Sequence, residues 1–442
     1  MMNWDQLLSA HRFSKTEDGR PAEPPTTDPF RSPFEADYDR VVYSTPFRRL
    51  ARKTQVHPLA LNDHVHTRLT HSLEVASVGR SLARRLAKFL EQRNEMPETI
   101  DGHDLAWIAQ SACLAHDIGN PPFGHAGEFA VREWVDDHQD IVFGDQIGAE
   151  NVALRNDFLI FEGNAQGFRL AARGDNPETG YMRLTFATLG AMIKYPWDSS
   201  DVRAVNKRKF NVYSTELEHF HLLVEEMSMR SASGTPARHP LSFLTEAADD
   251  ICYRILDLED AVEMRIVPEQ RVRSVFVSMC SIAPNEAASL AEIRGQAIRA
   301  LIEDAWKVFE SDYQNIMNGS RQDDLKSGFS APLAESLDRV SSLYTEIFAD
   351  RTKVAAELGA YKALGRILRA LCDAVRELAT TEKDYEKMGF ISRRCLELAW
   401  SSEYAKSHKD KPFDWWLHQV MDYVSGLTDR YARRLSGEIA GT

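Results

Sequence analysis

A short stretch of the chain gathers residue types that can do chemistry. The segment ACLAHDIGNPPFGHAGE, from Ala112 to Glu128, places two histidines, an aspartate and a glutamate around a Pro-Pro turn. His116 and Asp117 are adjacent at the predicted end of a helix, where both side chains can turn toward one divalent metal ion. His125 and Glu128 are three residues apart, a spacing that suits a carboxylate orienting an imidazole for proton transfer. The plainer interpretations are a capping aspartate beside a packed histidine, and a surface ion pair.

A bound divalent ion needs about four to six donor atoms, so further ligands must come from elsewhere. His71 lies on the preceding predicted helix and can supply a third donor. Asp249, Tyr253 and Asp257 are four residues apart and therefore share one face of another predicted helix. Such a face is often merely solvated. A tyrosine between two carboxylates also fits a pocket floor, where one carboxylate meets a metal and the other groups meet hydroxyls.

Apolar residues at helical spacing predict the elements that carry these side chains. The stripe on the first helix is Leu69, Leu73, Ala76, Ala83, Leu86 and Leu90. Asp101 is the expected N-cap of the next helix and Gly119 its expected stop. Further helices are predicted over 244–262, 287–317, 333–348, 355–381 and 414–435, with loops near 228–240 and 318–328. The pattern leaves room for a few short strands around 206–216.

These patterns predict an all-α protein with few or no short strands. The stretch 17–35 is rich in proline and charge, so we expect an extended N-terminal arm over residues 1–36. Residues 37–442 are expected to form a single helical domain, with a metal-binding core at about 66–260 and a C-terminal helical part at about 261–442.

Composition narrows the function classes. The 442 residues include 53 Lys and Arg against 66 Asp and Glu, a formal charge of −13, which argues against a general nucleic-acid coat. Local basic segments remain, namely Lys207, Arg208 and Lys209, and Arg80, Arg84, Arg85 and Lys88. Five widely spaced cysteines indicate reduced thiols in a cytoplasmic protein. We expect neither a signal peptide nor a membrane span.

Three sequence blocks together resemble a known family. HTRLTHSLEV, AHDIGNPPFGHAGE and ADDICYRILDLED are similar to the HD-domain dNTP triphosphohydrolases, in particular the bacterial dGTPase-like group. FRRLARKTQV and DYVSGLTDRYA resemble that group as well, so the likeness extends from about residue 37 to residue 433. The long HDIGNPPFGHAGE block is far more specific than the HD dipeptide alone.

The resemblance implies an all-α HD fold with additional helices and one catalytic metal. Its ligands here would be His71, His116, Asp117 and Asp249. Asp249 is favoured over Asp250 because the family's ligand has a tyrosine four residues on and an aspartate eight residues on. Manganese or magnesium is the first expectation, with iron, nickel, cobalt or zinc as alternatives.

The family reaction splits a dNTP into a deoxynucleoside and intact triphosphate by attack of water on the α-phosphorus. By resemblance, His125 would transfer a proton and Glu128 would orient it. Substrate contacts would come from Arg68, Asn164, Lys194, Tyr195 and Arg430, and deoxyribose selection from Gln55, Val56, Tyr253 and Asp257. The resemblance further implies a preference for dGTP, a homo-oligomer with a hexamer favoured, and an effector nucleotide or single-stranded DNA as a further partner.

Two alternatives stay open from the sequence. One is an HD phosphohydrolase acting on another nucleotide phosphate ester, against which the GNPPFGHAGE extension and the matching terminal blocks argue. The other is a nucleic-acid-binding or regulatory protein that has kept the fold. The complete ligand set and the acidic composition argue against that as a sole role.

Overall fold

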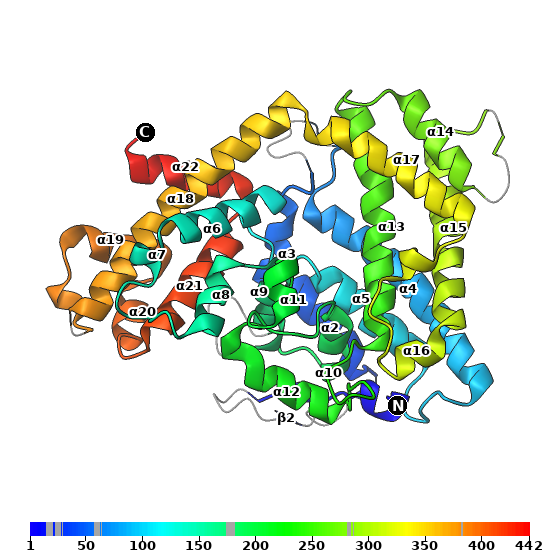
Figure 1. Cartoon of the computed structure of the whole chain (residues 1–442), viewed down its shortest axis with the longest axis horizontal. Helices are drawn as coiled ribbons and strands as arrows, with labels where there is room; N and C mark the ends of the chain where they lie inside the picture. Colours follow the sequence, from blue (N-terminus) through cyan, green and yellow to red (C-terminus); the bar gives the residue numbers. More distant parts are fainter. Residues whose placement is uncertain are drawn as a thin grey trace.

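The computed structural model of the chain is built almost entirely from α-helices (Figure 1). It describes residues 1–442 except 15–20, 23–27, 29, 57–61, 63, 174–181, 281–283, 286 and 382, and it describes only the backbone at 21–22. The all-α fold class predicted from the sequence is confirmed. Among the described residues the regular strands are two short antiparallel ones near the N-terminus, β1 (Arg12–Phe13) and β2 (Pro21–Ala22).

Three helices that position the candidate site begin at well-defined caps. In α4 (Arg68–Arg93), Thr67 and Thr70 form a reciprocal capping box. In α5 (Gly102–Ala115), Asp101 caps the first turn as predicted. In α13 (Pro240–Glu263), the His239 side chain accepts the N–H of Leu241, and a proline opens the helix, where its missing N–H has no cost. The caps fix where each helix starts and therefore which residues face inward.

Two hydrophobic cores organise these helices. In the first, α5 packs against α4, α2 (Pro33–Tyr43) and α10 (Phe186–Met192), and α13 packs against α4 and α15 (Leu290–Ser311). The other helices contributing to it are α1 (Trp4–Leu7), α3 (Thr45–Arg49), η1 (Leu50–Arg52), α9 (Gly163–Ala172), α12 (Leu217–Glu226), α14 (Glu269–Met279), α16 (Tyr313–Met317), η3 (Leu325–Gly328) and α17 (Ala331–Phe348).

In the second core, the long helix α18 (Arg351–Thr380) packs against α6 (His125–Asp137), α19 (Phe390–Ala399), α21 (Phe413–Gly426) and α22 (Asp429–Ala440). The remaining elements on this side are α7 (Gln139–Val142), α8 (Val152–Leu159), α11 (Val202–Lys207), η2 (Ser214–Glu216), η4 (Tyr385–Lys387) and α20 (Ser402–Ser407). Figure 1 shows the two groups side by side, with α4, α5 and α13 on the right and α18 to α22 on the left.

The two cores do not follow the expected division near residue 260. Residues 123–165 pack with the C-terminal helices, whereas α14 to α17 pack with the first core. The described N-terminal residues also belong to the body of the protein, because Trp4 and Phe13 are buried and α2 begins at Pro33. Part of the expected extended arm therefore packs on the helices, and residues 15–20, 23–27 and 29 lie outside the described residues. The overall division into domains stays a prediction.

Three local predictions are wrong for identifiable reasons. Residues 206–216 contain no strand in this fully described stretch, where one isolated bridge joins Val212 to Asp198. Leu73 is 46% exposed, because the buried face of α4 is centred on Val75 and Leu82, and Leu73 projects away from it. α5 ends at Ala115, before Gly119. A Cβ at Gly119 would lie 2.1 Å from the backbone nitrogen of Gly167, so this glycine permits close packing on α9.

Candidate active site

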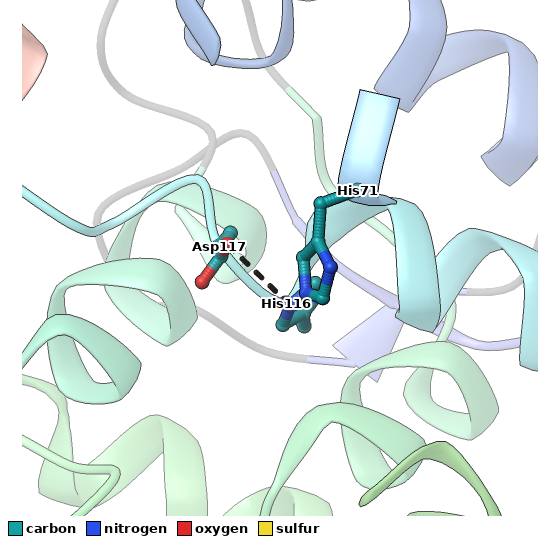
Figure 2. A group of neighbouring side chains, drawn as sticks. All are labelled: His71, His116 and Asp117. Atoms are coloured by element: carbon teal, nitrogen blue, oxygen red, sulfur yellow. Dashed lines mark ion pairs between the residues drawn. The ribbon is translucent and has the colours of Figure 1, made fainter. Parts of the chain in front are cut away.

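Three helices bring the four expected metal ligands together. His71 lies in the first turn of α4, and Asp249 lies in the middle of α13. His116 and Asp117 directly follow the last residue of α5. One donor atom each from His71, His116 and Asp117 fall within 4.8 Å of one another (Figure 2). Oδ1 of Asp249 completes the group, at 3.0 Å from Nε2 of His71 and 3.5 Å from Nε2 of His116.

The donor set fits a divalent metal ion. Two imidazoles and two carboxylates converge, a combination that several divalent metals accept. Nδ1 of His116 lies 2.6 Å from the carbonyl oxygen of Cys113 and donates to it. This bond leaves the lone pair of Nε2 available on the side of Asp117 and Asp249, the outer-sphere arrangement usual for metal-binding histidines.

The charges of the ligand group also favour a bound cation. Burial would lower the pKa of His116, but Asp117 and Asp249 outweigh burial and raise the pKa to about 9. Burial would raise the pKa of Asp117, but Arg68 and His116 lower it. The pKa of Asp249 is likewise held well below its ordinary value, by His116 and His71 against the effect of burial. Both carboxylates are therefore ionised, and the centre favours added positive charge.

Asp117 is fixed by two donors outside the ligand group. Nη1 of Arg68 donates to Oδ2 of Asp117 at 2.5 Å, and the side-chain amide of Asn120 donates to Oδ1. Asn120 is followed by Pro121 and Pro122, which cannot continue a helix and so force the chain to turn after the ligand pair. The turn places Asn120 beside Asp117 and leads directly into α6.

His125 is the first residue of α6, and Glu128 lies one turn later. Among the described residues no hydrogen bond joins them. The buried carboxylate of Glu128 accepts the N–H of Gly163 at 2.9 Å, and Nζ of Lys209 lies 3.9 Å away. Burial, Arg68 and Lys209 lower the pKa of His125, while Glu128 acts against them. Glu128 thus influences His125 through charge, and the expected direct orienting contact stays a prediction.

A cavity of about 240 Å³ opens beside the ligand group. Among the predicted site residues it is lined by Gln55, Arg68, His116, Asp117, His125, Glu128, Asn164, Lys194, Tyr195, Asp249 and Tyr253. Lys209, from the basic segment noted in the sequence, lines it too, although it was not expected at this site. Polar residues that the sequence did not single out complete the lining: Asn120, Glu162, Ser242, Thr245 and Glu246. The structure therefore brings most of the predicted residues to one space.

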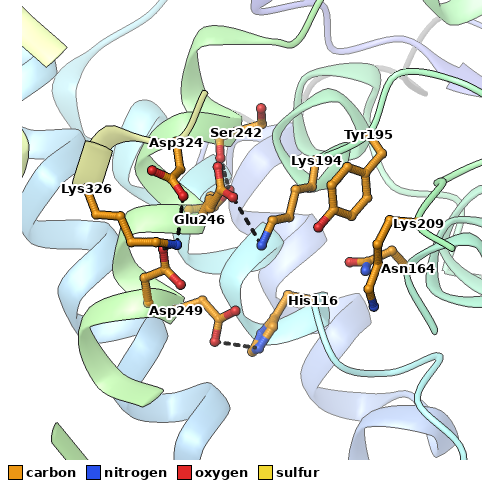
Figure 3. Close-up of polar contacts among 12 residues, drawn as sticks. His116, Asn164, Lys194, Tyr195, Lys209, Ser242, Glu246, Asp249, Asp324 and Lys326 are labelled. Atoms are coloured by element: carbon orange, nitrogen blue, oxygen red, sulfur yellow. Dashed lines mark hydrogen bonds and ion pairs between the residues drawn. The ribbon is translucent and has the colours of Figure 1, made fainter. Parts of the chain in front are cut away.

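One side of this cavity is rich in cations (Figure 3). Nζ of Lys194 lies 3.1 Å from Oε1 of Glu246, and Nζ of Lys209 lies 2.6 Å from Oε1 of Glu162. Although burial opposes it, these carboxylates raise the pKa of both lysines, so both are charged at neutral pH. Together with Arg68, which pairs with Asp117, they form a cationic wall next to the expected metal ligands, in which each cation lies beside a carboxylate.

Two buried polar residues organise that wall. Glu162 accepts the backbone N–H of Asn164 at 2.5 Å and its side-chain amide at 3.0 Å, in addition to Lys209. Asn211 accepts the backbone N–H of Lys194 at 3.0 Å and that of Tyr195 at 2.7 Å. These contacts set the positions of the residues that line the cavity, so the wall is preorganised.

A second, more apolar groove of about 760 Å³ adjoins the cavity, and Gln55, His125 and Tyr253 line both. Val56 lines only the groove. Asp257 lines neither space, because it is buried and accepts the hydroxyl of Tyr344 at 3.1 Å. Arg430 is exposed at the start of α22 and lines neither space. The structure thus brings Gln55, Val56 and Tyr253 together but not these last two residues.

Comparison with known proteins places the chain in a family. Residues 68–159 match the HD domain model. The chain is 40% identical to a deoxyguanosinetriphosphate triphosphohydrolase-like protein of Pseudomonas aeruginosa, over all of this chain and 99% of that protein. The chain belongs to the deoxyguanosinetriphosphate triphosphohydrolase-like family of HD-domain proteins. A member from Synechocystis sp. is 34% identical, over all of this chain and 99% of its own length.

A deoxyguanosinetriphosphate triphosphohydrolase of Klebsiella pneumoniae is 35% identical over 63% of this chain and 58% of that protein. The match to the HD domain model contains His71, His116, Asp117, His125 and Glu128 but ends before α13, which carries Asp249. In the part of this HD-family chain that the structure describes, no helix has the length and apolar character needed to cross a membrane.

Some lining residues of this HD-family site could have been found from the sequence. Ser242, Thr245, Glu246, Asp249 and Tyr253 recur at three- and four-residue steps along α13, so they share the face that already carried the predicted acidic residues. Glu162 and Lys209 line the cavity, and Asn211 supports its wall. They carry no such spacing signal, because they come from loops and helix ends whose course the local pattern does not determine.

Proposed function

We propose that the chain is a metal-dependent dNTP triphosphohydrolase. It would split a dNTP, with dGTP preferred, into a deoxynucleoside and intact inorganic triphosphate. The observation that carries this proposal is the cationic wall of Arg68, Lys194 and Lys209 beside the converging metal ligands. The protein as a whole is acidic, so a bound triphosphate needs local cations, and this wall supplies three of them beside the metal centre. The full-length relatives named triphosphohydrolase-like proteins support it.

His71, His116, Asp117 and Asp249 would hold one divalent ion, which supplies Lewis acidity that activates water and polarises the phosphoryl oxygen. Water attacks the α-phosphorus, a new P–O bond forms and the bond to the 5′-oxygen breaks. One proton must reach the leaving 5′-oxygen. Arg68 would contact the α-phosphate, because it already donates to the ligand Asp117 and faces the cavity.

His125 is the group that we assign to proton transfer. It borders both the cavity and the groove, so it lies where a triphosphate and a nucleoside would join. Its lowered pKa makes the protonated imidazole a stronger acid toward a leaving alkoxide. The negative charge of Glu128, and that of a bound triphosphate, would favour the protonated form before the reaction.

The sugar would lie between the two spaces. Among the described residues Oε1 of Gln55 is buried without a hydrogen-bond partner, which leaves an acceptor free for the 3′-hydroxyl. Val56 offers nothing polar to a ribose 2′-hydroxyl, and an unsatisfied buried hydroxyl costs about 1–3 kcal/mol. The nucleobase would occupy the apolar groove. Asp257 supports Tyr253 indirectly, through Tyr344, whose ring stacks on that of Tyr253 at 5.7 Å.

The proposed partners are further copies of this chain and a nucleotide or single-stranded DNA. A homo-oligomer, with a hexamer favoured, is consistent with exposed apolar residues on α19, where Phe390 is 62% and Ile391 is 71% exposed. Lys207 and Arg208 are exposed and could meet single-stranded DNA or an effector nucleotide, whereas Lys209 points into the cavity. Substrate contacts from Asp257 and Arg430 remain predictions.

A nucleotide panel tests the proposal. Purified protein is incubated with each of the four dNTPs and with GTP, in manganese and then in magnesium, and the products are separated by ion-exchange chromatography. We expect a deoxynucleoside and triphosphate, fastest from dGTP, with little turnover of GTP. A monophosphate with pyrophosphate, or turnover confined to other phosphate esters, would refute the proposal.

A further inference from the structure

Asp429 connects the C-terminal helices to the candidate site. It is the first residue of α22, it is 2% exposed, and its carboxylate accepts three hydrogen bonds. Oδ1 accepts the backbone N–H of Phe123 at 2.9 Å. Oδ2 accepts the backbone N–H of Thr54 at 3.0 Å and the Thr54 hydroxyl at 2.5 Å. One buried side chain thus holds two segments that lie more than 300 residues earlier in the chain.

The first segment is the turn that presents His125. Phe123 has a φ of +67°, a left-handed conformation that a bulky side chain rarely adopts, and Gly124 follows with a φ of +60°. α6 then begins at His125. A conformation of this kind persists only where its surroundings hold it, and the bond to Asp429 holds the amide of Phe123 itself. The direction of His125 therefore depends on Asp429.

The second segment presents Gln55 and reaches Arg68. Thr54 directly precedes Gln55 and forms an isolated antiparallel bridge with Thr67. The N–H of Arg68 donates to the carbonyl of Lys53 at 3.0 Å. A Cβ at Gly124 would lie 2.9 Å from Nη2 of Arg68, so the two segments touch with no room to spare.

Lys53 adds a parallel support. Its buried Nζ donates to the carbonyl of Asn120 at 2.7 Å and to that of Ser425 at 2.5 Å. Ser425 lies in the last turn of α21, whose carbonyls have no partner within the helix and can accept from Lys53. The junction between α21 and α22 therefore contacts the candidate site at two independent points, although it lies far outside the residues that match the HD domain model.

We infer that Asp429 is a positioning residue that fixes the His125 turn and the Gln55 segment relative to each other. The C-terminal helices are then part of the active-site scaffold, and removing this one carboxylate impairs both proton transfer and sugar selection. The catalytic consequence rests on the proposed function, whereas the structural consequence does not. Arg430, which the sequence singled out in the same stretch, is exposed beside it.

The test uses the full-length variant Asp429→Asn, which keeps the shape of the side chain but cannot accept at both positions. Glu438→Gln is the matched control, because Glu438 lies on the same helix and, among the described residues, forms its ion pair with Arg434 at the surface. The first readout is hydrogen exchange measured by mass spectrometry. We expect peptides covering 117–128 and 50–56 to exchange about tenfold faster or more in Asp429→Asn, with the rest of the chain unchanged.

The second readout is turnover with metal loaded. We expect kcat for dGTP to fall on the order of 10- to 100-fold, with metal content unchanged, and the preference for dGTP over GTP to decrease. Thr54→Val removes only the hydroxyl donor, so it should reduce the preference with a smaller loss of kcat. Thr54→Val also replaces Asp429→Asn as the test variant if Asp429→Asn proves globally unstable.

The outcomes separate the two proposals. Wild-type protein that hydrolyses no dNTP refutes the proposed function, yet the exchange experiment still tests the role of Asp429. Unchanged exchange in both segments, or wild-type kcat and sugar preference in both Asp429→Asn and Thr54→Val, would overturn the inference while leaving the proposed function intact.

Discussion

Nε2 of His71 lies 3.0 Å from Oδ1 of Asp249, although the two residues are 178 positions apart in the chain. The contact exists because α4 packs against α13 and both helices pack against α5, whose end supplies His116 and Asp117. Three helices with separate caps thus converge on one set of ligand atoms. The neighbouring Asp250 points elsewhere, to Nζ of Lys326 at 2.7 Å.

Asp249 and Asp250 therefore offer a matched pair of substitutions. We expect Asp249→Asn to lose bound metal and turnover, because the weaker amide ligand replaces a carboxylate in the centre of the donor set. Asp250→Asn should keep both, since among the described residues its ion pair is the partly exposed one with Lys326, outside the expected ligand group. Metal content by inductively coupled plasma mass spectrometry, measured beside kcat, decides this. Equal metal loss in both variants would contradict the assignment.

His125→Ala separates metal binding from proton transfer. His125 makes no contact with the ligand atoms among the described residues, so the variant should retain its metal. Loss of a general acid or base typically lowers the rate by about 10² to 10⁴-fold. Single-turnover kinetics at saturating dGTP measure the chemical step directly. A reduction of less than about tenfold is incompatible with the role that we assign.

Gln55→Ala tests sugar selection. The free acceptor on Gln55 would pair with the 3′-hydroxyl and hold the sugar against Val56. Without it the sugar can shift, so the ratio of kcat/KM for dGTP to that for GTP should fall by about fivefold or more. Competition assays with both nucleotides give this ratio in one mixture. An unchanged ratio removes Gln55 from sugar selection.

Lys209→Met tests the cationic wall, with Lys207→Met as its control. Lys209 lines the cavity, whereas Lys207 is exposed at the end of α11. We expect Lys209→Met to raise KM for dGTP about tenfold or more, because a buried charge-assisted contact to phosphate is lost. Lys207→Met should leave KM unchanged. If the two variants behave alike, Lys209 belongs to a general basic segment and not to the site.

His239 should make the free energy of unfolding depend on pH. It is buried, caps α13 by accepting the N–H of Leu241, and burial lowers its pKa to about 4. The unfolded chain takes up this proton at about pH 6.5, so the stabilising contribution is complete above 6.5 and is lost as pH falls toward 4. His239→Asn keeps a capping acceptor without a titrating group.

The difference in unfolding free energy between wild type and His239→Asn should therefore change across pH 4 to 6.5, by about 1.4 kcal/mol for each unit of pKa difference. Urea titrations at several pH values measure this difference. A difference that stays constant across that window would show that His239 is not held neutral by burial.

Much of this site could be predicted from sequence because its groups occur in two local patterns. His116, Asp117, His125 and Glu128 lie in one short block, and the acidic face of α13 repeats at helical spacing. Helix periodicity also predicted α4, α5 and α13, because their buried faces are long and regular.

The rest depends on tertiary packing that local patterns do not encode. Asp257 lies on the same helix face as Asp249, as the spacing predicted. It is covered by Tyr344 from α17, which the spacing could not predict. Asp429 acts through backbone N–H groups of distant segments, and Glu162 acts through the Nζ of Lys209, 47 residues away. No spacing rule connects either residue to the motif. One continuous helix was expected over 414–435, but the helix is interrupted at Leu427 and Thr428, between α21 and α22.

The most direct test of the central claim is hydrolysis of dGTP in ¹⁸O-labelled water, with both products analysed by mass spectrometry. Attack of water on the α-phosphorus predicts one ¹⁸O atom in an intact triphosphate and none in deoxyguanosine. Label in deoxyguanosine would place the attack on the 5′-carbon. Label in phosphate or pyrophosphate would mean cleavage between phosphates, and either result would contradict the account.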